Sequence, residues 1–312
     1  MGYTDPMTSS MRGGSENVEV RTVCPLGATL GEGPIWLAED AALWFVDIKE
    51  RQLHRFHPAS GGLKSWDAPG QVAWVVPMAD GGLLTGLQTG LHRFEPKTGA
   101  FEHLAEVEPA LPGNRLNDAT VGPDGRLWFC SMDDGEEKPS GHVYRADASG
   151  IARVASGHSI INGPALSPDG RTLYYNDTAG GVMYASRIAE DGSLADTRVF
   201  ARLDPTEGHP DGPTVDAEGC VWVGMFGGWG VRRYAPDGTL LRFVRLPVAN
   251  ITKVAFGGPD LRTVYATTAS KGLSDQERAA QPLAGHLFAF DAGVTGQPGH
   301  KVAPFPSHRH YD

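Results

Sequence analysis

One structural unit recurs along most of this chain. Its clearest copy runs from Asn114 to Met132, where a polar cluster leads into a short apolar run, Pro123-Asp124-Gly125 follows, and Leu127-Trp128-Phe129 resumes an apolar segment. An Asp-Gly pair between two apolar runs is typical of the tight turn that joins antiparallel strands. The unit therefore contains two antiparallel strands, and the fold has to accommodate its repetition.

Six copies of this unit are visible, each marked by one pair of apolar or aromatic residues. The second residues of successive pairs lie 40, 44, 46, 48 and 43 positions apart, which is the period of four short strands in one propeller blade. The repeat predicts an all-β, six-bladed β-propeller. A β-sandwich is the rival all-β fold, but it does not require six copies of one unit. The pairs are Leu43-Trp44, Leu83-Leu84, Leu127-Trp128, Leu173-Tyr174, Val221-Trp222 and Val264-Tyr265.

Each copy continues into a further apolar run before a polar turn, as in His54-Arg55-Phe56 and Val143-Tyr144-Arg145. We expect these runs to be outer strands. The 41 glycines and 23 prolines interrupt the chain too often for long helices. Val18 to Val23 alternates in polarity ahead of the first copy, and we expect it to close the ring as the outer strand of the last blade, because an unpaired blade would expose a strand edge.

The copies occupy the chain as one body, so we expect a single propeller domain over residues 18–296. Residues 1–17 are rich in Gly, Ser and Thr and are expected to form a disordered leader. Residues 297–312 are expected to be a C-terminal tail. His300, His308 and His310 suggest a metal-binding tract there, but a short terminal segment without other ligands is more typical of a solvated tail.

The charge balance restricts the partners of this protein. There are 27 basic and 37 acidic residues, a net charge of −10, and no basic run, so nucleic acid and anionic membrane surfaces are not expected partners. The chain has no apolar stretch of membrane-spanning length and no signal-peptide pattern, which predicts a cytoplasmic protein, and we expect a monomer. The three cysteines, Cys24, Cys130 and Cys220, lack disulfide or metal spacing and are expected to be buried.

The polar beginnings of the copies carry the strongest chemical signal. Three of them share an oxygen-bearing residue followed by Gly-Pro, at Glu32, Asn162 and Asp211, and Asn117-Asp118 fills that place in a fourth. The distance to the aromatic residue of each copy is 11 or 12 positions, so these are equivalent positions in different blades. Innermost strands of a propeller run the same way beside the axis, so equivalent positions converge on one mouth.

Two carboxylates and amide oxygens around one axis predict a site for a divalent metal ion. Calcium, magnesium, manganese, zinc and ferrous iron (Ca²⁺, Mg²⁺, Mn²⁺, Zn²⁺, Fe²⁺) are all chemically admissible, and the sequence does not choose among them. Taken singly, each residue is also an ordinary turn former, since Asn-Gly and Asp-Gly favour turns. The common phase across four copies favours the metal site.

Further polar groups flank the predicted site. Arg115 lies two residues before Asn117, so both face the mouth in an extended strand, where Arg115 either binds substrate oxygens or bridges two blades. Loops 108–113 and 133–139 flank the opening, and the charges of the second, Asp133, Asp134, Glu136 and Glu137, are either polar contacts or solvated. His209, two residues before Asp211, supports that residue or is structural. No Gly-x-Ser-x-Gly or HExxH motif is present, so hydrolysis would depend on the metal and a carboxylate.

From about Cys24 to Gly296 the chain resembles the SMP-30/gluconolactonase/regucalcin family of propeller lactonases. Within that family it looks most like bacterial sugar lactonases, particularly xylonolactonases, through Leu30 to Lys49 and the run Lys271-Gly272-Leu273-Ser274-Asp275. The motifs that carry the family resemblance are Gly31-Glu32-Gly33-Pro34-Ile35-Trp36, Phe45-Val46-Asp47-Ile48, Asn114-Arg115-Leu116-Asn117-Asp118, Ile161-Asn162-Gly163-Pro164, Pro210-Asp211-Gly212 and Phe256-Gly257-Gly258.

The resemblance implies hydrolysis of a sugar lactone to the aldonic acid, most plainly a pentonolactone such as xylonolactone. It implies that Glu32, Asn162 and Asp211 hold one divalent ion, that Arg115 and Asn117 hold the sugar hydroxyls, and that Asp211 is also the general base. It places Asn117 nearer substrate than metal. Met132 is followed here by Asp133-Asp134-Gly135, which departs from the vertebrate regucalcin pattern. Two other functions remain open: organophosphate or aryl-ester hydrolysis, and metal binding without catalysis.

Overall fold

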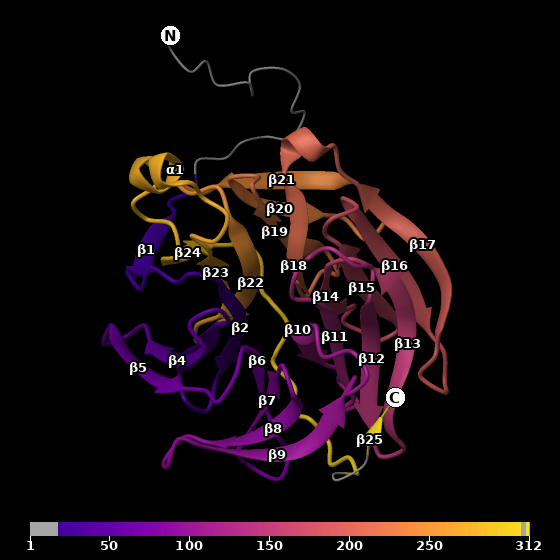
Figure 1. The fold of residues 1–312 in the computed structure, drawn as a ribbon. Coiled ribbons are helices and arrows are strands. Elements are labelled where there is room, and N and C mark those ends of the chain that lie inside the picture. The colour runs from indigo at the N-terminus through magenta and orange to yellow at the C-terminus, as the bar shows by residue number, and fades with distance from the viewer. Residues whose placement is uncertain (1–17, 307–309, 312) are drawn as a thin grey trace.

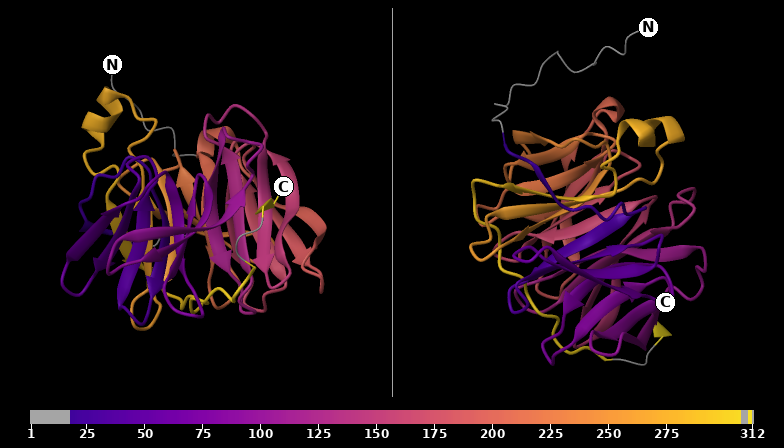
Figure 2. Two further views of the ribbon diagram at one scale, coloured as in Figure 1. Left: turned by 60° about the horizontal axis from the view of Figure 1, so that its bottom comes forward. Right: turned by 90° about the vertical axis from the view of Figure 1, so that its left-hand side faces the viewer.

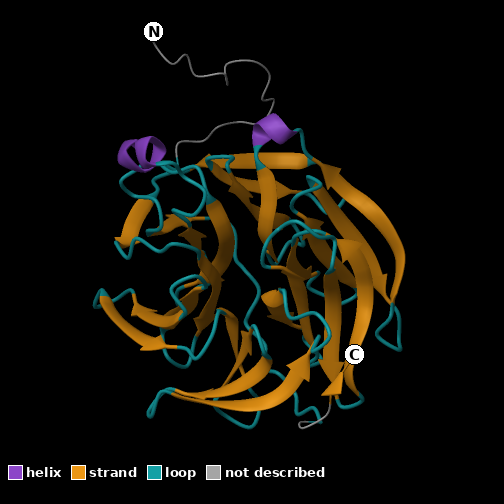
Figure 3. Cartoon of the chain, in the orientation of Figure 1, coloured by secondary structure: helices purple, strands orange, loops and turns teal. Residues whose placement is uncertain are grey.

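The computed structural model describes residues 18–306 and 310–311. Within them the chain is almost entirely β-structure, arranged as short sheets around a central axis (Figures 1 and 3). The first strand of each repeat lies nearest the axis and later strands lie progressively further out. The all-β propeller predicted from the repeat is therefore confirmed. The expected leader, residues 1–17, lies outside the described residues.

Three of the sheets contain four consecutive antiparallel strands each. The first comprises β2 (Gly31–Leu37), β3 (Ala42–Asp47), β4 (Gln52–His57) and β5 (Gly62–Asp67). The second comprises β10 (Asn114–Val121), β11 (Leu127–Asp133), β12 (Gly141–Asp147) and β13 (Gly150–His158). The third comprises β14 (Ile161–Leu166), β15 (Thr172–Asp177), β16 (Val182–Ile188) and β17 (Leu194–Arg202).

Two further sheets are larger. One contains β6 (Val72–Pro77), β7 (Leu83–Leu87), β8 (Gly90–Glu95) and β9 (Ala100–Val107), with β25 (His310–Tyr311) parallel to β9. The other has eight strands: β18 (His209–Val215), β19 (Val221–Phe226), β20 (Gly230–Tyr234) and β21 (Leu240–Arg245), then β22 (Ile251–Gly257), β23 (Thr263–Thr268), β24 (Leu287–Asp291) and β1 (Arg21–Cys24). A parallel bridge between Gly212 and Lys253 joins its two halves.

Two expectations about the outer strands need correction. Segments such as His54-Arg55-Phe56 form the third strand of their repeat, because a fourth strand, here β5, pairs outside them. The N-terminal strand begins at Arg21 rather than Val18 and pairs antiparallel with β24. Sequence polarity distinguishes buried strands from exposed ones, but it does not give the number of strands that lie outside them.

The predicted tight turns explain why each copy folds back on itself. Between β10 and β11, Gly125 has a φ of 78°, which glycine adopts without strain, and the Asp124 side chain accepts a 3.0 Å hydrogen bond from the Arg126 N–H. The turn between β14 and β15 repeats this with Gly170 at a φ of 67° and Asp169 accepting from the Arg171 N–H at 3.1 Å. The Asp-Gly pair thus fixes the register of these two inner hairpins.

The hydrophobic core lies between neighbouring sheets rather than at the axis. Trp44, Trp128 and Trp222, three of the aromatic residues that mark the repeat, are fully buried there. Each innermost strand contacts the innermost strands of the adjacent repeats, and β2 contacts β22. Thr252 Oγ1 also donates to the Gly31 carbonyl at 2.5 Å. The last repeat therefore packs against the first, and the three cysteines are free and buried, as expected.

The C-terminal segment was expected to be solvated, and over residues 297–306 this is wrong. Gln297 Nε2 donates to the Leu166 and Val215 carbonyls at 3.0 and 3.1 Å, and the Val302 side chain is buried. Figure 2 shows this segment, in yellow, along the side of the ring opposite helix α1 (Asp275–Ala280). Its apolar residues are sparse, so composition alone did not reveal that it packs on the ring.

Helical structure among the described residues is limited to short segments. These are α1 and the 3₁₀ helix η1 (Pro205–Glu207), each opened by a side chain that caps its first turn. No helix in the described ranges has the length and apolar character needed to cross a membrane. We call the side of the ring that carries α1 its mouth; the innermost strands begin on this side.

Candidate functional site

Strand register brings the oxygen-bearing residues of the repeats to one level of the axis. The innermost strand of each repeat pairs its aromatic marker with a residue three positions beyond the predicted site residue, for example Ile35 with Trp44 and Ala165 with Tyr174. Each innermost strand also shifts register at this point. The equivalent residues are Glu32, Ala73, Asn117, Asn162, Asp211 and Thr252.

The three predicted metal ligands are buried at the starts of β2, β14 and β18. Glu32, Asn162 and Asp211 are exposed by only 3%, 3% and 5%. Glu32 Oε2 accepts a 2.8 Å hydrogen bond from the Gly33 N–H, and Asn162 Nδ2 donates to Thr178 Oγ1 at 2.8 Å. Asn162 Oδ1 accepts one bond, from Asn117 Nδ2 at 2.8 Å; within the described chain this leaves Glu32 Oε1 and one lone pair of Asn162 Oδ1 for another ligand.

The two carboxylates disfavour each other's charged form. Burial, followed by the charge of Asp118, raises the pKa of Glu32 to about 8 despite the opposing charges of Lys253 and Arg115. Burial, followed by the charge of Glu32, raises the pKa of Asp211 well above its usual value. Raised pKa values of this kind are typical of acidic groups gathered without a neutralising cation.

The donor set fits a divalent cation. Asp211 Oδ1 is buried and has no hydrogen-bond partner among the described residues, and a buried polar atom left unpaired in a native protein requires an explanation. Two carboxylates and an amide oxygen, without sulfur or imidazole, suit a hard or borderline divalent ion. Such an ion would neutralise Glu32 and Asp211 and accept the unpaired oxygen as a ligand.

Arg115 and Asn117 form a hydrogen-bonded pair beside these residues. Arg115 Nη1 donates to Asn117 Oδ1 at 2.6 Å, and Asn117 Nδ2 donates to Asn162 Oδ1 at 2.8 Å. The amide of Asn117 therefore connects Arg115 to a candidate metal ligand. Arg115 is buried rather than on the surface, and its Nη2 group makes no hydrogen bond within residues 18–306, so it remains available to an oxygen-rich ligand.

Asp134 fixes the guanidinium of Arg115 from the opposite side. Its carboxylate accepts hydrogen bonds from Arg115 Nε at 2.8 Å, Lys49 Nζ at 2.6 Å and Gln71 Nε2 at 2.9 Å. Burial acts to raise its pKa, but the bonds from Lys49 and Gln71 and the charge of Arg115 lower the pKa of Asp134 to about 2. This carboxylate is therefore ionised at neutral pH and ties the third repeat to the first.

The loop 133–139 reaches across the mouth, as its position in the sequence suggested. Asp133 accepts hydrogen bonds from the N–H groups of Glu137 and Lys138, at 3.0 and 3.2 Å, which shape the loop. Glu136 forms an ion pair with Lys271 from the last repeat. Of the four acids in this loop, only Glu137 is exposed and has a side chain that bonds to no other described residue. Most of these charges therefore make specific contacts.

The neighbouring loop 108–113 is held by a buried carboxylate that the sequence did not single out. Glu108 Oε1 accepts hydrogen bonds from Ser131 Oγ at 2.6 Å, His142 Nδ1 at 2.5 Å and Tyr144 OH at 2.7 Å, and Oε2 accepts from Asn114 at 2.8 Å. The His142 ring bonds to the carboxylate, and Ser131 Oγ accepts a 3.1 Å hydrogen bond from the backbone N–H of His142, so this cluster anchors the loop.

Other residues near the site were missed or left undecided by sequence. Thr178 Oγ1 accepts from Asn162 and donates to the Pro210 carbonyl at 2.8 Å, and His209 Nδ1 lies 3.0 Å from the Thr178 carbonyl oxygen. His209 thus connects β18, the strand that contains Asp211, to Thr178. Lys253, also missed, forms an ion pair with Asp118. A lone charged residue in an otherwise uncharged inner strand was the signal that could have found it.

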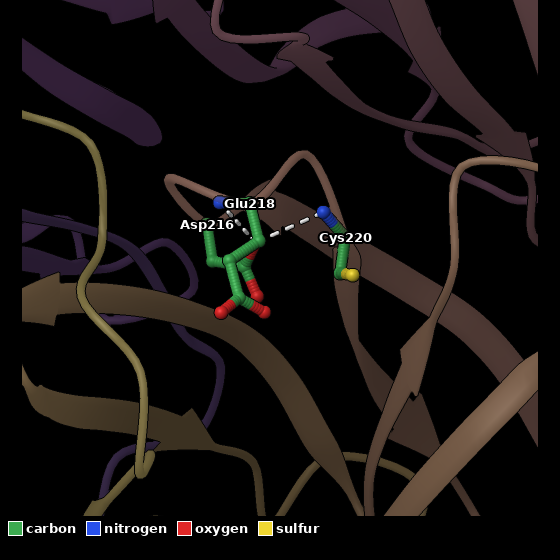
Figure 4. A group of neighbouring side chains, drawn as sticks. All are labelled: Asp216, Glu218 and Cys220. Carbon is green, nitrogen blue, oxygen red and sulfur yellow. Dashed lines mark hydrogen bonds between the residues drawn. The ribbon is translucent and has the colours of Figure 1, made fainter.

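A second acidic group, Asp216, Glu218 and Cys220, also has ligand-type atoms close together (Figure 4). Its hydrogen bonds are those of a turn. Asp216 Oδ1 accepts from the N–H groups of Glu218 and Cys220, at 3.0 and 2.9 Å, and Oδ2 accepts from Trp222 Nε1 at 2.9 Å. Burial, followed by the charge of Asp216, raises the pKa of Cys220, which disfavours a thiolate ligand. We therefore place the candidate site at the axis.

The raised pKa of Glu32 predicts how stability depends on pH. Its folded-state pKa of about 8 exceeds the ordinary value of 4.5, so its contribution is fully present below pH 4.5 and is lost as pH rises through about 8. For metal-free protein we expect the free energy of unfolding to fall over this window by on the order of a few kcal/mol.

Denaturant unfolding at pH 4.5 to 8.5 measures this effect, with Glu32→Gln as the matched control. The glutamine has no proton to lose, so the curve of the variant should be flatter. Adding a divalent cation at pH 8 should restore stability to the wild type more than to the variant. Parallel curves for the two proteins would contradict the assigned pKa.

Comparison with known proteins identifies relatives of this chain. The chain is 36% identical to the L-arabinolactonase of Azospirillum brasilense over 283 residues, covering 89% of this chain and 93% of that protein. It is 34% identical to the 6-deoxy-6-sulfogluconolactonase of Pseudomonas putida over 284 residues, covering 90% and 97%. The solved structure of a calcium-binding protein, regucalcin, from Agrobacterium tumefaciens superimposes with a TM-score of 0.86 at 30% identity, covering 91% and 97%.

The family profile described as SMP-30/Gluconolactonase/LRE-like region matches residues 30–270. That span contains every residue of the candidate site, from Glu32 in β2 to Lys253 in β22. With most of its length matched by the profile and relatives above 30% identity over nine-tenths of it, the chain belongs to the SMP-30/gluconolactonase/regucalcin family.

Proposed function

We propose that this protein hydrolyses a sugar lactone to the corresponding aldonic acid, with a divalent cation held by Glu32, Asn162 and Asp211. One observation carries the proposal: the unpaired Asp211 Oδ1 lies in a buried oxygen cluster connected through Asn117 to the buried Arg115. Relatives named as lactonases support the reaction class. A pentonolactone such as xylonolactone is the substrate we favour, since an arabinolactonase is among those relatives.

The residues of the chain divide the work of hydrolysis. Arg115 Nη2 donates hydrogen bonds to hydroxyl oxygens of the sugar, and Asn117 and Asp134 hold the guanidinium in place for this contact. The Asp211 carboxylate takes a proton from the attacking water as the oxygen of that water bonds to the lactone carbonyl carbon. As the ring C–O bond breaks, that proton passes to the departing ring oxygen. When bound, a divalent cation would stabilise the carbonyl oxygen's developing negative charge.

The proposed ligand set makes a direct prediction for two variants. Glu32→Ala and Asp211→Ala each remove a carboxylate, so we expect both to lose divalent metal and to reduce lactonase activity by at least about 10³-fold. Metal content is measured by elemental analysis, and hydrolysis by acid release from xylono-, arabino-, galactono- and gluconolactones, corrected for spontaneous ring opening.

Glu218→Ala is the matched control, because it removes a carboxylate from the other acidic group while leaving the axis intact. It should retain metal and activity; loss of metal in this variant alone would move the site to Asp216, Glu218 and Cys220. A phosphotriester in the same panel tests the ester-hydrolase alternative. Tight metal binding with no accelerated ring opening on any lactone would favour metal binding without catalysis; the Agrobacterium relative is described as a calcium-binding protein.

The carboxylate of Asp134 makes a separate prediction about substrate binding. Asp134→Asn keeps the size of the side chain but removes the charge that holds Arg115 and Lys49. We expect KM for the preferred lactone to rise about tenfold with a smaller change in kcat, because Arg115 loses its fixed orientation. Steady-state kinetics beside Glu137→Gln, an exposed acid of the same loop, measures this. A KM equal to that of Glu137→Gln would contradict the role.

We further propose that the ring has six blades and that β1 closes it. Dividing the eight-stranded sheet at the Gly212 to Lys253 bridge gives β1 the outer position of the last blade, beside β24. The side chains of Val18 and Val20 are partly buried against the core cluster that contains Phe288 and Phe290 of β24. This packing supports a contribution of the segment to stability. Because β1 pairs with the last blade and continues along the chain into the first, this closure joins two repeats that are distant in sequence.

Deletion of residues 1–24 tests this closure. Compared with deletion of residues 1–17, it also removes β1 and exposes the edge of β24, so we expect the melting temperature to fall by several degrees, about 4 °C or more. Scanning calorimetry on both proteins measures the difference, which isolates residues 18–24. Identical melting curves would show that β1 is dispensable.

A further inference from the structure

An ion pair lies directly beneath the candidate ligands. Asp118 and Lys253 each stand one residue beyond the ring of equivalent site residues, in the third and last repeats. Their side chains meet as a buried ion pair, with Asp118 fully buried and Lys253 6% exposed. Two residues from separate repeats thus place opposite charges together at the axis, although either charge alone would be costly to bury.

Asp118 also holds the strand that carries Asn162. Its Oδ2 accepts a 3.0 Å hydrogen bond from the Gly163 N–H, and its Oδ1 accepts a 2.7 Å bond from the Ala119 N–H. Gly163 directly follows Asn162, so the carboxylate of Asp118 fixes the backbone beside one candidate ligand. A side chain of other length or charge would release that N–H in a buried setting.

Lys253 lies against the strand that carries Asp211. A Cβ at Gly212 would stand 2.5 Å from Lys253 Cγ and 2.6 Å from Lys253 Cβ, so only glycine leaves room for the lysine stem at this point. Gly212 directly follows Asp211 and forms the backbone bridge to Lys253. The two members of the ion pair therefore contact the residues next to two different candidate ligands.

The charges of the pair act in opposite senses on the carboxylates above them. Lys253 lowers the pKa of both Glu32 and Asp211, whereas Asp118 raises both. Arg115 also lowers the pKa of Glu32, and Lys271 lowers that of Asp211. The charge at the axis is thus a balance in which the pair contributes one unit of each sign.

We propose that Asp118 and Lys253 are positioning residues that set the affinity of the axial site for a divalent cation, Asp118 strengthening and Lys253 limiting it. The proposal rests on the proposed metal site. A cation held by Glu32, Asn162 and Asp211 would be attracted by the carboxylate below and repelled by the ammonium group. The pair therefore holds the ligand strands in place while keeping the net charge beneath the cation near zero.

Calorimetric titration of chelator-treated protein with Mn²⁺ at pH 8 tests this inference. Lys253→Met keeps an unbranched stem over Gly212 but removes the positive charge, so Kd should fall on the order of tenfold. Asp118→Asn leaves the ammonium uncompensated, so Kd should rise on the order of tenfold. The double variant should return to within about threefold of wild type.

Arg233→Met is the matched control, because it breaks the ion pair of the partly buried Arg233 with the buried Asp216, at the far end of β18. It should lower the melting temperature without changing the Kd for Mn²⁺. Changes of the same sign in both single variants, or none in either, would overturn the electrostatic role. The electrostatic role would also be overturned if both single variants failed to fold while the double variant folded and bound Mn²⁺ normally, since the pair would then be structural only. Absence of Mn²⁺ binding by wild type would instead refute the proposed metal site.

Discussion

The candidate site depends on holding two carboxylates close together in a buried setting that disfavours the ionised form of each. Glu32 and Asp211 come from different repeats, are buried at the axis and raise each other's cost of ionisation. Flexible strands would separate such groups, since like charges repel strongly in a medium of low polarity. The ring prevents separation, because each innermost strand packs against both of its neighbours and the apolar residues between sheets resist displacement.

The axis is organised in levels with different chemistry. At the mouth, Arg115 and the Asp134 carboxylate present oriented polar groups beneath the loop 133–139. Below them lie the candidate ligands, and then the Asp118 to Lys253 ion pair. Beyond the pair is a cavity of about 130 Å³, lined in part by Pro34, Pro164 and Pro213, which the C-terminal segment covers through Gln297. The C-terminal segment therefore covers part of the far end, and the candidate ligands lie on the mouth side of the ion pair.

Proximity of acidic residues does not by itself identify a metal site in this chain. Asp216, Glu218 and Cys220 are close in space because they are close in sequence, and the hydrogen bonds of Asp216 are used to shape a turn and hold Trp222. Glu32, Asn162 and Asp211 are distant in sequence, and Asp211 Oδ1 has no hydrogen-bond partner in the described part of the chain. An unsatisfied buried oxygen is the more informative signal, because turns satisfy their own polar atoms.

The sequence by itself determined the repeat, the all-β propeller and the common phase of Glu32, Asn117, Asn162 and Asp211, because these follow from local turn chemistry and strand periodicity. It did not reveal that His54-Arg55-Phe56 lies inside a further strand, that residues 297–306 pack on the ring, or that Lys253 meets Asp118. The last two features are contacts between residues far apart in sequence, such as Lys253 and Asp118, which are 135 residues apart. Only the tertiary structure decided them, since side-chain reach across the axis depends on how the repeats pack and not on the pattern within any one of them.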